Sequence, residues 1–232
     1  MGVTVCEAVE ADADLELVAR VDLEDDNQLL VDARAEVAVD FTTPDSVKKN
    51  IEFCLSNGIH VVVGTTGLSE ADLDDIGKRA TEAPANVFVA PNFAIGAVLM
   101  MRFAAQAASH FRNAEIIERH HEDKLDAPSG TALRTARLMN EARGEGWSEV
   151  ADATESLDGS RGGDAGGVHV HSVRVPGSVA HQEVILGSPG ETLTIRHDSL
   201  DRASFMPGVV LAVKQVSSLD GLTVGLEHLL DL

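Results

Sequence analysis

The chain has 232 residues, and 38 acidic side chains against 18 basic ones give it a formal net charge of −20. Because such a chain repels phosphate groups, the charge excludes a protein that binds nucleic acid or an anionic membrane through a basic surface. Apolar residues make up 44% of the sequence, enough for one large domain or two small ones with their own cores. No apolar run is long enough to span a bilayer.

The composition also indicates the surroundings of the protein. Tyrosine is absent, aromatic residues make up 3% of the chain, and lysine is scarce. Together with the acidity, these features are typical of adaptation to molar salt, where the Debye length falls to about 3 Å and self-repulsion is screened. An acidic protein from an ordinary environment is the alternative. Cys6 and Cys54 have neither metal nor redox spacing, so we expect reduced thiols and a cytoplasmic protein.

The first 93 residues alternate short apolar strands with amphipathic helices, which predicts a parallel sheet covered by helices. One helix is expected to start at Thr43 and Pro44, and another at a capping box made by Ser69 and Asp72. The expected strands are 15–22, 36–41, 59–63 and 86–90.

Residues 94–202 show a different pattern, with longer strands and only two helices. We expect helices at about 95–109 and at 131–142, strands at 115–119, 168–175, 181–186 and 192–196, the last three antiparallel, and a mobile loop at 158–167. The last thirty residues return to helical spacing. The predicted fold is α/β: a Rossmann-like domain with a parallel sheet in the first 93 residues, followed by an α+β domain (94–202) with a mixed or antiparallel sheet.

One short segment, residues 115–132, concentrates groups that can carry chemistry. His120 and His121 follow the expected strand directly, and adjacent strand residues point to opposite faces, so we expect different roles for them. A histidine can act as an acid near neutral pH, and Lys124 can bind a carboxylate or give up a proton.

The same segment ends in a helix start that suits an anion. Ser129 can cap the helix, and the free backbone N–H groups there attract negative charge. Ser129, Gly130 and Thr131 therefore form a candidate carboxylate cradle. The alternative for a bare His-His-x-x-Lys is a solvated polar loop after an edge strand.

The segment Glu-Ile-Ile-Glu-Arg-His-His-Glu-Asp-Lys-Leu-Asp-Ala-Pro-Ser-Gly-Thr-Ala resembles the signature of the 4-hydroxy-tetrahydrodipicolinate reductase (dihydrodipicolinate reductase) family. The resemblance continues at 40–42, 62–67, 90–93, 199–208 and 229–232, and so spans nearly the whole chain. It implies NAD(P)H-dependent reduction of a ring dicarboxylate in lysine and diaminopimelate biosynthesis. It further implies that residues 1–93 and 203–232 form a nucleotide-binding domain and residues 94–202 a substrate domain, and that the protein is a homotetramer formed through the sheet of the substrate domain.

The resemblance assigns roles to residues of the segment. His120 and Lys124 become the acid–base pair, and the ring carboxylates are expected on His121, Lys124, Gly130 and Thr131, with Ser129 shaping the helix start.

The resemblance also places the cofactor. Its expected contacts are Asp22, Gly64, Thr65, Thr66, Ala90, Pro91, Asn92 and Phe93. Asp22 would bind the ribose hydroxyls, although a turn residue at a strand end is its simpler interpretation. Leu23 and Glu24 follow it where an arginine often accompanies NADPH, so we favour NADH weakly over NADPH.

A nicotinamide-binding fold normally carries Gly-x-Gly-x-x-Gly after its first strand, and these 232 residues contain no such motif. We expect that the first strand and most of this loop precede an internal methionine taken as the start. Two alternatives remain: a non-catalytic homologue that has lost dinucleotide binding, and another two-domain dehydrogenase such as aspartate dehydrogenase. No metal site is expected, because His169 and His171 fit one polar face of a strand.

Overall fold

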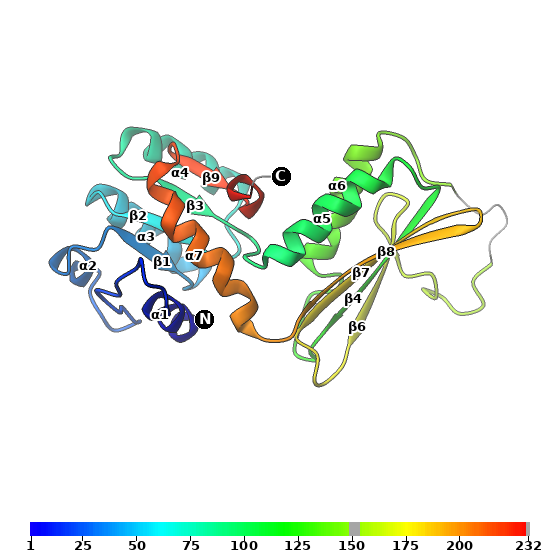
Figure 1. Ribbon diagram of the computed structural model, residues 1–232, viewed down its shortest axis with the longest axis horizontal. Coiled ribbons are helices and arrows are strands. Elements are labelled where there is room, and N and C mark those ends of the chain that lie inside the picture. Colours follow the sequence, from blue (N-terminus) through cyan, green and yellow to red (C-terminus); the bar gives the residue numbers. More distant parts are fainter. Residues whose placement is uncertain (149–153, 231–232) are drawn as a thin grey trace. The chain divides into compact units, whose positions relative to one another are not determined.

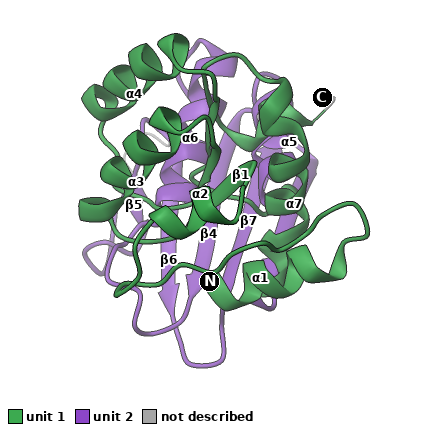
Figure 2. Ribbon diagram, turned by 90° about the vertical axis from the view of Figure 1, so that its left-hand side faces the viewer, with its two compact units in different colours: residues 1–95, 202–232 green, residues 96–201 purple. Residues whose placement is uncertain are grey.

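The computed structural model describes residues 1–148 and 154–230 (Figure 1). The chain divides into two compact units, shown in Figure 2: unit 1 comprises Met1–Ile95 and Arg202–Leu232, and unit 2 comprises Gly96–Asp201. These boundaries lie within two residues of the expected ones. Both ends of the chain therefore contribute to unit 1, and unit 2 is inserted between them.

Unit 1 contains a four-stranded sheet in the order β1-β2-β3-β9, and every neighbouring pair is parallel. Its strands are β1 (Val37–Asp40), β2 (His60–Val63), β3 (Val87–Val89) and β9 (Leu222–Val224). β1, β2 and β3 are rich in valine, and the central strands β2 and β3 are almost fully buried, as expected for a parallel sheet covered on both faces. The predicted Rossmann-like sheet is thus confirmed.

Helices surround this sheet and bury an apolar face against it. They are α1 (Gly2–Ala11), α2 (Gln28–Asp32), α3 (Pro44–Ser56), α4 (Glu70–Glu82) and α7 (Met206–Gln215), with short 3-10 turns η1 (Arg202–Phe205), η2 (Val216–Ser218) and η3 (Leu226–Leu229). The predicted capping box of α4 is confirmed, since Ser69 and Asp72 bond each other's backbone amides. Thr43 is the N-cap of α3, but its hydroxyl donates a hydrogen bond to the hydroxyl of Ser46 and does not cap a backbone amide.

Two predictions for unit 1 were wrong. Residues 15–22 belong to no sheet ladder in the described parts of the chain, although their sequence is apolar enough for a strand. A strand forms only where a neighbour pairs its backbone, and β1 is the end strand of this sheet. The last thirty residues contain α7 as expected, but also β9, a three-residue strand that pairs with β3.

Unit 2 contains a five-stranded sheet in the order β5-β6-β4-β7-β8. Its elements are α5 (Ile95–Ala108), β4 (Asn113–His120), α6 (Gly130–Arg143), β5 (Gly163–Asp164), β6 (His169–Arg174), β7 (Ala180–Ser188) and β8 (Glu191–Ser199). The sheet is mixed, as predicted, because β4 pairs with β7 antiparallel and with β6 parallel.

The directions of the three later strands alternate as expected, because β7 is antiparallel to both β4 and β8 and β6 runs parallel to β4; only the neighbour of β6 was not predicted. β6 lies beside β4 rather than β7, and it runs parallel to β4 because α6 and the following segment carry the chain back across the sheet. The loop expected at 158–167 contains the short strand β5. Within residues 1–148 and 154–230, no helix is both long enough and apolar enough to cross a lipid bilayer.

Candidate active site

The carboxyl ends of β1, β2 and β3 carry the loops that were predicted to bind the cofactor. Asp40, at the end of β1, is buried and organises two of these loops. Its Oδ1 accepts hydrogen bonds from the Thr42 hydroxyl at 2.8 Å and the Thr65 hydroxyl at 2.7 Å, and its Oδ2 accepts one from Asn50 at 2.8 Å. One carboxylate therefore holds the loop after β1 against the loop after β2.

Aromatic packing joins the same loops to the loop after β3. The ring of Phe41 lies so close to Gly64 that a Cβ on this glycine would come within 2.1 Å of it, so a larger residue would require the ring to move. The rings of Phe41 and Phe93 lie 5.7 Å apart between centroids. Gly208 of α7 also packs directly on the carbonyl of Phe93. The structure therefore brings the predicted residues at 64–66 and 90–93 together at one edge of the sheet.

Asp22 lies in a different setting from these loops. It is exposed, it belongs to a turn rather than to a strand end, and its carboxylate accepts a hydrogen bond from the amide of Leu23 at 2.8 Å. Its amide donates to Asp25 at 2.9 Å. These contacts are those of a local turn residue, and the ribose-binding role of Asp22 stays a prediction.

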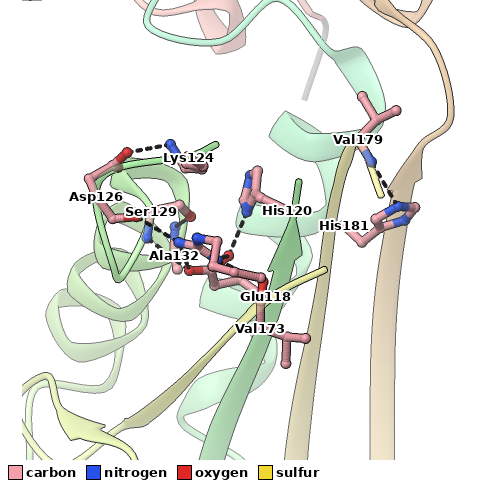
Figure 3. Close-up of polar contacts among 10 residues, drawn as sticks. Glu118, His120, Lys124, Asp126, Ser129, Ala132, Val173, Val179 and His181 are labelled. Carbon is pink, nitrogen blue, oxygen red and sulfur yellow. Dashed lines mark hydrogen bonds and ion pairs between the residues drawn. The ribbon is translucent and has the colours of Figure 1, made fainter. Parts of the chain in front are cut away.

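The second group of predicted residues lies at the end of β4 in unit 2 (Figure 3). Ile116, Glu118 and His120 alternate along this strand and share the face that is buried in the unit, because successive side chains of a strand point to opposite faces. His120 is the last strand residue and is largely buried. His121 follows outside the strand and is exposed, so the two histidines do have different surroundings.

Glu118 is fully buried and is the centre of this site. Its Oε2 lies 2.5 Å from Nδ1 of His120, and the two guanidinium nitrogens of Arg174 donate to its two carboxylate oxygens at 2.8 Å each. Its Oε1 also accepts a hydrogen bond from the Ser129 amide at 3.2 Å. Arg174 donates further to the carbonyl of Asp126 at 2.6 Å. Sequence analysis missed both Glu118 and Arg174.

Burial and the neighbouring charges shift the pKa values of Glu118 and His120. Burial acts to raise the pKa of Glu118, but hydrogen bonds from Arg174, Ser172 and His120 outweigh it and hold that pKa below its usual value. Burial lowers the pKa of His120; Glu118 opposes this, while the positive charges of Lys124 and Arg174 add to it. The ring of His120 is therefore easier to deprotonate than a free histidine.

The helix start was predicted correctly. Ser129 is the N-cap of α6, is buried, and accepts a hydrogen bond from the Ala132 amide at 3.2 Å. Gly130 faces open space, so a ligand can approach the first turn of the helix. Lys124 lies in the loop before it and pairs with the exposed carboxylate of Asp126 at 2.7 Å. The ion pair holds the pKa of Asp126 below its usual value, through the hydrogen bond from Lys124 above all.

Among the residues that the structure describes, no group of three or more His, Cys, Asp or Glu side chains is arranged to hold a metal ion. His171 instead pairs with Glu115 at 2.7 Å on the outer face of the sheet, and Arg161 donates to the same carboxylate.

A parallel sheet that presents loops at its carboxyl ends, joined in one chain to a unit with a histidine–lysine site, defines a two-unit, nucleotide-dependent oxidoreductase. Two family descriptions match the chain: "Dihydrodipicolinate reductase, N-terminus" over residues 1–93, and "Dihydrodipicolinate reductase, C-terminus" over residues 96–230. The chain belongs to the dihydrodipicolinate reductase family.

Known relatives agree with this assignment over the full length. The chain is 57% identical to 4-hydroxy-tetrahydrodipicolinate reductase of Mycolicibacterium smegmatis and 57% identical to that of Corynebacterium diphtheriae, in both cases over 100% of this chain and 95% of the relative. Among solved structures, dipicolinate-bound dihydrodipicolinate reductase from Paenisporosarcina sp. TG-14 matches with a TM-score of 0.90 and 39% identity, over 99% of this chain and 95% of that one.

More distant structures share the fold alone. A probable dehydrogenase from Thermotoga maritima matches with a TM-score of 0.62 at 14% identity, and covers 98% of this chain and 89% of that one. The family resemblance predicted from the 115–132 segment is confirmed, and the relatives decide against the aspartate dehydrogenase alternative.

Proposed function

We propose that this protein catalyses the NAD(P)H-dependent reduction of 4-hydroxy-tetrahydrodipicolinate in lysine and diaminopimelate biosynthesis. The reaction consumes one NAD(P)H and one proton, and yields tetrahydrodipicolinate, NAD(P)⁺ and water. The observation that carries this proposal is that the buried Glu118 contacts both His120 and the start of α6, while Lys124 lies in the loop between them and its charge acts on His120. The names of the relatives with 57% identity support the same reaction.

The substrate is a dianion, and unit 2 offers it a cation and a helix start. Lys124, His121, Gly130 and Thr131 bind the ring carboxylates, with the amides at the start of α6 as donors. Lys124 exchanges Asp126 for a substrate carboxylate when the substrate arrives. Ser129 keeps the first turn of the helix in place by capping it.

His120 and Lys124 form the acid–base pair of the reaction. Hydride addition to the ring must be balanced by a proton, and a histidine beside the bound ring supplies it. Since the Nδ1 atom of His120 faces Glu118, the Nε2 atom is the one that exchanges a proton with the substrate.

The loops of unit 1 fit a dinucleotide because they lie at the carboxyl ends of adjacent parallel strands. Gly64, Thr65 and Thr66 line one side and Ala90, Pro91, Asn92 and Phe93 the other. Within them, Thr66 and Pro91 are exposed to a ligand, whereas Thr65 and Phe93 are buried as supports. When bound, the nicotinamide supplies the hydride. Asp22 and its acidic neighbours favour NADH over NADPH.

The test is oxidation of NADH and of NADPH by the 232-residue chain in molar KCl, with substrate made freshly from pyruvate and aspartate semialdehyde. We expect turnover with both cofactors and a higher kcat/KM with NADH. A folded protein that binds neither cofactor and shows no turnover would support the non-catalytic alternative instead.

We also propose a cytoplasmic homotetramer that assembles through the sheet of unit 2. Its outer face carries partly exposed apolar side chains on neighbouring strands, among them Ile117 of β4 and Val173 of β6. Light scattering in molar KCl should give four times the chain mass of 24.5 kDa. A monomeric mass would contradict the tetramer and leave the reaction untouched.

A further inference from the structure

Glu118 connects three parts of unit 2 that are far apart in the sequence. Its two oxygens contact the catalytic histidine candidate at the end of β4, the N-cap residue of α6, and Arg174 at the end of β6 (Figure 3 shows the first two contacts). No part of the glutamate side chain is exposed, so it does not contact a ligand directly.

A buried carboxylate is costly unless charge and hydrogen bonds compensate it. Arg174 provides both, since its guanidinium donates to the two carboxylate oxygens in a bidentate arrangement. Glu118 therefore stays ionised, and an ionised carboxylate can only accept hydrogen bonds. The 2.5 Å contact with His120 then requires a proton on Nδ1 of the ring.

We propose that Glu118 is a positioning residue, which holds His120 in its Nδ1–H tautomer and keeps its Nε2 atom available at a fixed place relative to the start of α6. This rests on the proposed function, in which Nε2 exchanges a proton with the substrate. The bond from the Ser129 amide to the same carboxylate sets the helix start, so one buried charge orients both the proton carrier and the carboxylate cradle.

The competing explanation is that Glu118 only neutralises Arg174 inside the unit. In that case its removal lowers stability, but the ring of His120 keeps its tautomer in the molecules that remain folded. The two explanations differ in a spectroscopic property of one ring, which can be read whether or not the protein turns over substrate.

The decisive experiment is ¹⁵N NMR of histidine-labelled protein, wild type against Glu118→Gln, at a pH where the ring of His120 is neutral. The His120 signal is assigned by its loss in His120→Asn. In the wild type we expect the Nδ1–H form. In Glu118→Gln we expect a majority of the Nε2–H form, because the amide no longer requires a proton on Nδ1. An unchanged tautomer in the variant overturns the proposal.

Kinetics give a second readout. Because general acid–base catalysis contributes about 10²–10⁴-fold, we expect kcat of Glu118→Gln to fall by about 100-fold or more. The KM for NADH should stay within about twofold, because the loops of unit 1 are unaffected. The pH dependence of kcat should shift as well, since Lys124 and Arg174 then face His120 without the opposing carboxylate. Equal losses in every parameter, tracking the folded fraction, would favour the purely structural role.

Two further variants keep the test valid. If Glu118→Gln does not fold because Arg174 is left buried and unpaired, the double variant Glu118→Gln with Arg174→Gln removes that charge, and its His120 tautomer should still change. Glu115→Gln is the matched control: it lies on the same strand, pairs with Arg161 and His171, and faces the opposite side of the sheet. It should leave kcat and the His120 tautomer unchanged. If the wild type shows the Nδ1–H form but no turnover, the proposed function fails while the positioning of His120 stands.

Discussion

The two predicted sites are held together by different forces. In unit 1, the hydroxyl groups of Thr42 and Thr65 donate hydrogen bonds to Asp40, and the rings of Phe41 and Phe93 pack together. Hydrogen bonds to one carboxylate and aromatic packing therefore hold this site together. In unit 2, a buried carboxylate, a guanidinium and an imidazole form a charged network. The difference matches the two ligands: a dinucleotide is recognised by loops placed at strand ends, whereas a small dianion requires charge and a defined proton carrier. Substitutions that remove a charge should therefore impair the site in unit 2. Substitutions that change side-chain volume or remove a hydroxyl group should impair the site in unit 1.

Lys124→Ala should have the largest effect. Removing the cation takes away both a carboxylate partner and half of the acid–base pair, so we expect kcat/KM for the dicarboxylate to fall by about 10³-fold. NADH affinity should hardly change. Lys78→Ala, at an exposed position of α4, is the matched control and should leave both unchanged. Stopped-flow measurement of NADH binding and steady-state turnover decide this; near-normal turnover removes Lys124 from the chemistry.

The next largest effect should be a difference in pH dependence between the two sites: kcat should depend on pH, whereas the affinity for NADH should not. Burial holds the pKa of His120 below its usual value; the positive charges of Lys124 and Arg174 add to this effect and Glu118 opposes it. If the protonated ring supplies the proton, activity is lost as pH rises through that pKa, by about tenfold per pH unit. NADH affinity should be flat over the same range. The measurement is kcat and the Kd for NADH from pH 5 to 8. A matching slope in the Kd would remove the contrast between the sites.

Thr65→Val should weaken the first site alone. The substitution keeps the volume but removes the hydrogen bond to Asp40 and leaves a buried acceptor with one partner fewer. A lost hydrogen bond to a charged group costs about 1.5 kcal/mol or more, so the Kd for NADH should rise by about tenfold. Thr65→Ser retains the hydroxyl and should restore affinity to within about twofold. Calorimetric titration with NADH checks both variants; equal affinities would show that Asp40 does not support this loop.

The smallest effect should be that of salt concentration on thermal stability, and it should apply to both units. With a net charge of −20, the folded chain repels itself, and molar KCl reduces the Debye length to about 3 Å. We expect Tm to rise between 0.1 and 2 M KCl, by roughly 2–4 °C for each kcal/mol of screened repulsion. Sucrose at matched osmotic strength is the uncharged control. A Tm that falls or stays constant in KCl would contradict adaptation to salt.

Local signals in the sequence were sufficient for most elements and for the motif. The capping box of α4, the Ser129 cap of α6 and the valine-rich strands of unit 1 each follow from a few neighbouring residues, and all were predicted correctly. Residues 15–22 failed because strand formation depends on a partner, and β9 was missed because three residues carry no periodicity of their own.

The charged core of the candidate site needed the tertiary structure. Glu118 and Arg174 are 56 positions apart, and they meet because β6 pairs with β4 in a parallel register that the sequence does not reveal. One signal was available. Glu118 lies two residues after the buried Ile116 on the same strand, so both side chains point to the buried face, and a buried carboxylate requires a partner of opposite charge or hydrogen-bond donors. The identity of that partner could not be derived from periodicity.

The strand β9 has a consequence for how the chain is made. β3 obtains its second neighbour from the C-terminal segment, which follows the whole of unit 2 in the sequence. On the ribosome, β3 therefore remains an open sheet edge for on the order of ten seconds at about 5–20 residues per second. An open valine-rich edge is a template for pairing with other chains. Unit 1 thus reaches its final form only after synthesis is nearly complete, and protection of this edge during translation becomes part of producing the enzyme.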